Sequence, residues 1–188
     1  GAWTEVAEGE GWSWGVALFG PGFGESGTDE VSYDEVTLNM NGGTIQAGQG
    51  IGTNASSGRY AGNTITINGG TIEGMGDGGA AMYLPAIGKT TINGGTIKGE
   101  QGIRICAGEL TINGGTVNGT AALSPDADLV SGGSGGTEGA IVIGKAGTGY
   151  VGDIVVNISE NATVQNTATD GDVKPAIVVS DKNMALDN

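Results

Sequence analysis

The residues best suited to bind a ligand are two arginines, each placed near a tyrosine. Tyr83 and Arg104 occupy the polar position of two short apolar runs, and Arg59 adjoins Tyr60 in a stretch without apolar pattern. If both runs are β-strands, alternation with their neighbours directs Tyr83 and Arg104 away from the core. A guanidinium beside an aromatic ring suits a sugar or a uronate. Ordinary surface packing explains the same pairs without a ligand.

Two pairs of aspartates have a spacing that suits an oxygen-ligated cation. Asp126 and Asp128 lie in a long glycine-rich excursion, and Asp170 and Asp172 lie in a second one. Carboxylates separated by one residue are typical calcium ligands, although neither pair belongs to a complete EF-hand loop. Solvated acids in a turn are the alternative interpretation. We therefore expect no cofactor, with calcium as the one ion that these residues could hold.

The charge and composition exclude several classes of protein. The chain has 188 residues, a net charge of −14, no histidine and one cysteine, Cys106. Such an acidic chain repels phosphate, which argues against nucleic-acid binding. Without histidine, Ser-His-Asp hydrolysis and histidine-ligated zinc or haem are excluded, and one cysteine allows no intrachain disulfide. No apolar run is long enough for a membrane span, and no signal peptide opens the chain.

A five-residue repeat organises the chain. Asparagine, two glycines, threonine and a branched apolar residue recur at steps of 27, 25 and 20 residues, and each copy follows a short alternating run. Glycine supplies the positive φ that a sharp bend requires, and asparagine tolerates it. Each copy therefore predicts a corner between two strands. The copies begin at Asn41, Asn68, Asn93 and Asn113.

Three classes of short strand follow from this repeat. The first precedes the corner and is predicted at 36–40, 64–67, 90–92, 110–112 and 153–158. The second follows the corner, at 44–46, 71–73, 96–98, 116–118 and 163–165. The third comes after another glycine-rich stretch, at 16–19, 50–53, 81–84, 102–105, 140–143 and 176–179.

Three strands in each repeat of this length predict an all-β fold, a right-handed parallel β-helix (β-solenoid) of about five coils. We expect the right-handed form because a left-handed β-helix keeps a strict six-residue period, whereas the repeats of this chain vary in length. Equivalent residues should stack, with isoleucines inside and with threonine and asparagine ladders outside. We expect a single domain over 1–188, with an N-terminal cap and partial coil at 1–35, repeat coils at 36–165 and a last partial coil at 166–188.

Two other folds fit the sequence less well than the β-helix does. A helical fold fails because glycine and β-branched residues are poor helix formers. An antiparallel sandwich would not explain one motif recurring at one corner.

Trp3, Trp12 and Trp14 could form an apolar lid over the first coil or a platform for sugar rings. The C-terminal residues show no lid, so we expect the chain to be a segment of a larger protein.

The repeated Thr-Ile-Asn-Gly-Gly-Thr-Ile at 66–72 and 91–97 resembles repeats of bacterial surface and secreted β-helix proteins. These include adhesin-like proteins and carbohydrate-binding domains with the pectate lyase fold. The resemblance implies an extracellular or cell-surface address and a polysaccharide or glycoprotein partner. Pectate lyases use an arginine with calcium-binding acids on the face that Arg104 would share, but no strand acids accompany Arg104 here.

Three functions remain open after this comparison. We favour a non-catalytic binding or adhesion module for polysaccharide or host glycan, monomeric within a multidomain chain. The alternatives are a structural stalk and a polysaccharide lyase or glycoside hydrolase. The corner between the second and third strands varies most in length, and insertions on one side of a solenoid usually mark its working face.

Overall fold

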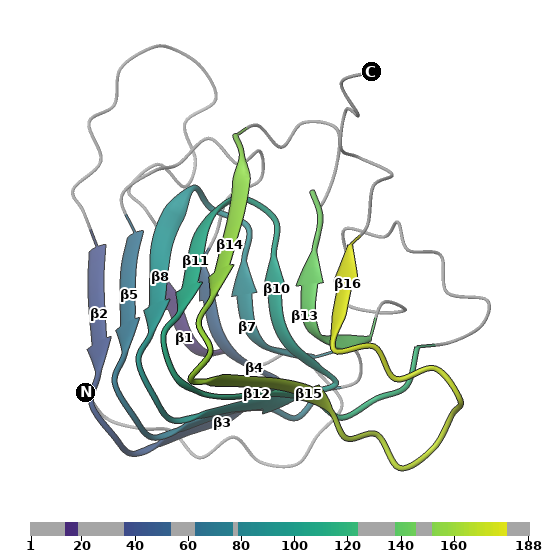
Figure 1. Ribbon diagram of the computed structural model, residues 1–188. Helices are drawn as coiled ribbons and strands as arrows, with labels where there is room; N and C mark the ends of the chain where they lie inside the picture. The colour runs from purple at the N-terminus through teal and green to yellow at the C-terminus, as the bar shows by residue number, and fades with distance from the viewer. Residues whose placement is uncertain are drawn as a thin grey trace, which may run out of the picture.

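The computed structural model describes residues 14–18, 36–53, 63–76, 79–123, 138–145 and 152–179. Within these ranges the chain forms sixteen β-strands, which pair in parallel in three sheets. Successive strands belong to different sheets, and each strand pairs with the strand three places further along the chain. The fold is a right-handed parallel β-helix with three strands per coil, as the repeat predicts (Figure 1).

The three sheets are named by their strands. Sheet A contains β1 (Trp14–Leu18), β4 (Gln49–Thr53), β7 (Ala80–Leu84), β10 (Gln101–Ile105), β13 (Gly139–Ile143) and β16 (Ile177–Val179). Sheet B contains β2 (Val36–Met40), β5 (Asn63–Ile67), β8 (Gly88–Ile92), β11 (Gly108–Ile112) and β14 (Ile154–Ile158). Sheet C contains β3 (Thr44–Ala47), β6 (Thr71–Gly74), β9 (Thr96–Gly99), β12 (Gly115–Gly119) and β15 (Ala162–Asn166). Predicted and observed strand ends differ by at most two residues.

The core consists of stacked apolar columns, one residue from each coil. The predicted columns are confirmed by the strand register, and most of their members are fully buried. Burial of an isoleucine side chain contributes about 1.5–3 kcal/mol, so these columns are the main stabilising element of the fold. The columns are Ile45, Ile72, Ile97, Val117 and Val164; Ile67, Ile92 and Ile112; and Ile51, Met82, Ile103, Ile141 and Ile177.

The second glycine of each repeat turns the chain between sheets B and C. Gly95 has φ +91°, a left-handed conformation that glycine adopts without the steric cost of a Cβ. A methyl group at this position would also lie 2.7 Å from Gly70 O in the coil below. The corner therefore requires glycine for both its conformation and its close stacking. Gly43, Gly70 and Gly115 have the same sign of φ.

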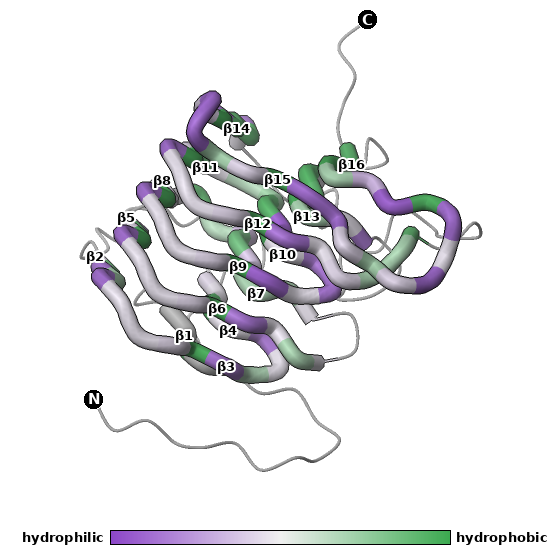
Figure 2. Tube along the Cα trace, turned by 60° about the horizontal axis from the view of Figure 1, so that its bottom comes forward, coloured by the Kyte–Doolittle hydropathy of each residue, from purple (hydrophilic) through white to green (hydrophobic). Residues whose placement is uncertain are grey.

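The asparagines of the repeat form the predicted ladder along this corner. Asn68 Nδ2 donates to Asn41 Oδ1 over 2.8 Å, Asn93 Nδ2 donates to Asn68 Oδ1 over 2.8 Å, and Asn113 Nδ2 donates to Asn93 Oδ1 over 2.9 Å. A row of hydrophilic positions follows the ends of β2, β5, β8 and β11 in Figure 2. Ser159 takes the next place and donates to Asn113 O over 2.8 Å, which ends the ladder.

The outer faces of sheets B and C are polar. The predicted threonine ladder on sheet C is confirmed by the register of its five strands, and its members are half-buried or exposed. It contains Thr44, Thr71, Thr96, Thr116 and Thr163. Across the described ranges, we find no helix with the length and apolar character that a membrane crossing requires.

Candidate functional site

Tyr83 and Arg104 stand side by side on sheet A, as predicted. Tyr83 in β7 is in register with Arg104 in β10, and Arg104 is in register with Val142 in β13. Their neighbours Met82 and Ile103 belong to the core, so Tyr83 and Arg104 lie on the outer face. Both residues make interactions within the chain. The pair predicted from alternation is therefore real as a geometric feature, while its role in binding stays a prediction.

The outer face of sheet A is not an open surface. Arg104 is only 3% exposed, Val142 is 0% exposed and Val178 is 7% exposed, although all three lie on the outer side of sheet A. Tyr83 is half-buried. Sheet A is thus buried on both faces, unlike sheets B and C. Buried parallel strands have continuous apolar runs rather than alternation, and residues 140–143 and 176–179 show that signal in the sequence.

Gln101, which the sequence interpretation missed, lies at the start of the same strand as Arg104. Its register partner Ala80 is outside the apolar core cluster, whereas the next residue, Ala81, belongs to it. A methyl group on Gly102, which is in register with Ala81, would meet the core side chain of Val117. Gln101 therefore points away from the core.

The carboxamide of Gln101 is buried without a hydrogen-bond partner. The residue is 0% exposed, and neither Oε1 nor Nε2 has a partner. Gln49, two coils earlier at the start of β4, is 4% exposed and its Oε1 also lacks a partner. Buried amides are nearly always paired, so an orphaned one points to a bound water or ligand group. The outer face of sheet A therefore has hydrogen-bonding capacity that the protein itself does not use.

The outer face of sheet C has a second polar group, formed by one residue from each of three coils. Lys98 Nζ lies 2.9 Å from Glu73 Oε1, and Gln46 Nε2 donates to Glu73 Oε2 over 2.7 Å. The hydrogen bond from Lys98, and then that from Gln46, lowers the pKa of Glu73 below its ordinary value. The charged and amide groups of these three side chains bind one another. They therefore stabilise the stack of coils and leave no vacant binding site among them.

The two variable corners meet beside β12 and β15. Leu123 and Val173 form an antiparallel bridge, with Leu123 N donating to Val173 O over 2.8 Å. Asp170 and Asp172 lie on this second corner and are exposed. Among the residues with described positions, no group of three or more acidic or cysteine side chains is placed to hold a metal ion. The positions of Asp170 and Asp172 neither confirm nor contradict the predicted calcium site.

Several predicted site residues lie outside the described ranges. They are Arg59 and Tyr60 of the ligand-binding prediction, Asp126 and Asp128 of the metal prediction, and Trp3 and Trp12 of the lid or platform. Trp14 is placed in β1, in register with Gln49. The candidate site is accordingly built from Tyr83, Arg104 and Gln101 only.

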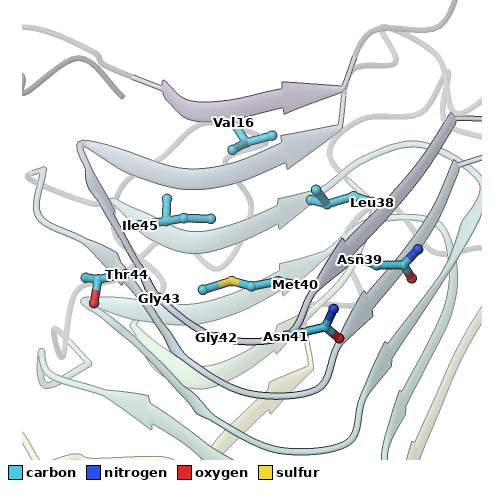
Figure 3. Close-up of a pocket in the computed structure, with 9 residues that line it drawn as sticks. All are labelled: Val16, Leu38, Asn39, Met40, Asn41, Gly42, Gly43, Thr44 and Ile45. Carbon is cyan, nitrogen blue, oxygen red and sulfur yellow. The ribbon is translucent and has the colours of Figure 1, made fainter. Parts of the chain in front are cut away.

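A pocket of about 340 Å³ lies at the N-terminal end of the coil. Figure 3 shows Val16, Leu38, Met40 and Ile45 pointing into it, whereas Asn41 points away. Its apolar lining consists of the core positions of the first strands in each sheet. This pocket is the end of the hydrophobic core and has no convergent polar groups of the kind that orient a ligand.

No family model, curated protein or solved structure matches this chain.

Proposed function

We propose that this chain is a non-catalytic binding module of the cell surface or extracellular space, which recognises polysaccharide or protein-linked glycan. The observation that carries the proposal is the buried, unpaired carboxamide of Gln101 on the same face as Tyr83 and Arg104. A carboxamide both donates and accepts, which matches sugar hydroxyls. The ring of Tyr83, further along the same face and in register with Arg104, offers an apolar face for a sugar ring.

The scaffold supports this proposal by holding the three side chains on rigid strands. Arg104 is in strand register with Tyr83 in β7 on one side and with Val142 in β13 on the other. Ile103 and Ile105, which flank it, are buried in the core. Sites built on strands lose little conformational freedom on binding, which favours affinity. The partial exposure of Tyr83 gives a ligand its point of entry to the face.

A second candidate, a structural stalk, is favoured by a different observation. The polar side chains of the asparagine corner and of the outer face of sheet C bind one another, as in Asn68 with Asn41 and Lys98 with Glu73. Such a surface stabilises a column without requiring any ligand. The two candidates differ in one measurable respect, because a stalk binds no glycan.

Binding to immobilised bacterial, plant and host glycans tests the proposal. We expect the wild-type chain to bind at least one class of glycan. The Gln101→Met variant keeps the side-chain length without the polar atoms, and we expect it to remain folded and to lose binding tenfold or more, by about 1.4 kcal/mol. Tyr83→Ala should weaken binding in the same direction.

The matched control is Gln165→Met on the exposed face of sheet C, which removes the same amide group away from the site. It should bind as the wild type does. A chain that binds none of the glycans would support the stalk instead. Equal binding by Gln101→Met and wild type would show that the site on sheet A is wrong.

A further inference from the structure

The asparagine ladder has a chemical consequence because each of its four asparagines precedes glycine. In an Asn-Gly sequence the glycine backbone nitrogen can attack Cγ of the asparagine side chain. A nitrogen–Cγ bond forms, the Cγ–Nδ2 bond breaks, and the nitrogen gives up its proton while the departing amide gains one and leaves as ammonia. Water then opens the succinimide ring to aspartate or isoaspartate. No oxidant or cofactor is needed.

The ladder restrains this reaction at its inner members. Asn68 and Asn93 each donate one side-chain hydrogen bond and accept another, so rotation of either amide towards the backbone breaks two bonds. Asn113 donates to Asn93, and the attacking nitrogen of Gly114 itself donates to Ile92 O over 3.3 Å. In each of these three asparagines the leaving group, Nδ2, is therefore held in a hydrogen bond.

The corners also stack closely at these positions. A methyl group at Gly69 would lie 3.2 Å from the backbone oxygen of Asn41. A methyl group at Gly94 or Gly114 would lie 2.9 Å from the backbone oxygen of the asparagine in the preceding coil. Ring closure changes the shape of the corner, so a closely packed neighbour opposes it. The stacking acts in the same direction as the hydrogen bonds.

Asn41 is the exception at the N-terminal end of the ladder. Its Oδ1 accepts from Asn68, but its Nδ2, the group that leaves, donates no hydrogen bond that the structure describes. Its side chain is exposed and points away from the core at the end of β2 (Figure 3). No atom lies within 4 Å of a methyl group added at Gly42. This corner therefore lacks a described hydrogen bond from the leaving nitrogen and a close neighbour at Gly42, although its amide oxygen still accepts from Asn68.

We propose that Asn41-Gly42 is a self-modification site, where the folded protein deamidates in preference to its other repeat corners. The aspartate product is compatible with the ladder, because an aspartate at this position still accepts the hydrogen bond from Asn68 Nδ2. The fifth Asn-Gly pair, Asn118-Gly119, lies within β12, and Asn118 pairs with Thr167 over 2.8 Å. It belongs with the protected set.

The test is incubation of the whole folded chain in mildly alkaline buffer, followed by peptide mapping and enzymatic methylation of isoaspartate. We expect conversion at Asn41 to be about tenfold or more faster than at Asn68, Asn93 or Asn113, as loss of one to two hydrogen bonds predicts. The chain unfolded in urea provides the control. There the four repeat corners share the same local sequence and should convert at similar rates.

Two variants sharpen this measurement without disturbing the core. Asn41→Gln should remove the fast phase, because its longer side chain closes the ring poorly. Gly42→Ala should slow it, since the added methyl group hinders attack while it contacts nothing else. If Asn68, Asn93 or Asn113 converts as fast as Asn41 in the folded chain, the proposal is wrong.

Discussion

Asn93 Nδ2 donates to Asn68 Oδ1 over 2.8 Å, and this bond joins two coils whose asparagines are 25 residues apart in sequence. The ladder to which the bond belongs has a direction, because each amide nitrogen donates towards the N-terminal end of the stack. Asn41 is therefore only an acceptor, whereas Asn93 must both donate and accept. Chemically equal residues thus have unequal roles.

The direction of the ladder predicts unequal effects of the same substitution. Asn93→Asp removes a donor and sets a carboxylate against Asn68 Oδ1, so we expect the free energy of unfolding to fall by about 1–2 kcal/mol. Asn41→Asp keeps the one side-chain hydrogen bond that the structure describes for Asn41, and the change should stay within about 0.5 kcal/mol. Urea unfolding measures both. Equal destabilisation by the two variants would contradict the direction of the ladder.

The close stacking of the corners predicts a strong effect at Gly95. In Gly95→Ala the methyl group meets Gly70 O at 2.7 Å, and φ is +91°. The left-handed conformation alone costs about 1–2 kcal/mol for a residue with a Cβ, and displacement of the neighbouring coil adds to it. We expect a loss of about 2 kcal/mol or more in thermal or urea unfolding. The control Gly42→Ala has no neighbour within 4 Å and should be nearly neutral.

The Glu73–Lys98 pair predicts a small dependence of stability on pH. The hydrogen bond from Lys98 lowers the pKa of Glu73 in the folded state. A lowered folded pKa means that the stabilisation is present above the unfolded pKa and is lost as pH falls through the folded pKa. Because Lys98 is 45% exposed, we expect a contribution below about 1 kcal/mol.

The comparison of wild type with Glu73→Gln in urea unfolding isolates this pair. The difference in unfolding free energy should be largest near neutral pH and low salt. It should shrink towards about pH 2–3, where the carboxylate is protonated in both states, and also in high salt. A difference that changes with neither pH nor salt would show that the ion pair contributes nothing.

The burial of sheet A on its outer side predicts that charge is not tolerated there. Val142→Lys places an ammonium at a position that is 0% exposed, and we expect a loss of about 3 kcal/mol or more. Val155→Lys is the matched control, since Val155 lies on the outer face of sheet B, is 46% exposed and is in register with Glu109. It should be neutral. If Val142→Lys were as stable as the control, sheet A would be open on its outer face.

The strands and their register follow from the sequence to a large extent. The columns through Ile72 and Ile97 and the ladder through Asn68 and Asn93 lie where the repeat predicts. The reason is local, because a repeated strand and a repeated glycine corner bring equivalent residues to one strand spacing of each other. The alternation rule also placed Tyr83 beside Arg104 correctly.

The burial and hydrogen bonding of the candidate site could not be predicted from the sequence in the same way. Alternation indicates on which side of a strand Arg104 lies, but it says nothing about what packs against that side. Arg104 and Val142 are buried, and Gln101 is buried with its amide unpaired. The uninterrupted apolar runs at 140–143 and 176–179 were the available signal.

The sequence by itself determined the coil, because period, corner and inward-facing residue are all set within one repeat and the next. Only the tertiary structure decided how the repeats differ: that Asn41 accepts but does not donate, and that sheet A is buried on both faces while sheet C is not. Exposure and hydrogen bonding depend on what each residue meets across coils and at the ends of the stack. Identical motifs therefore acquire different chemistry from their positions.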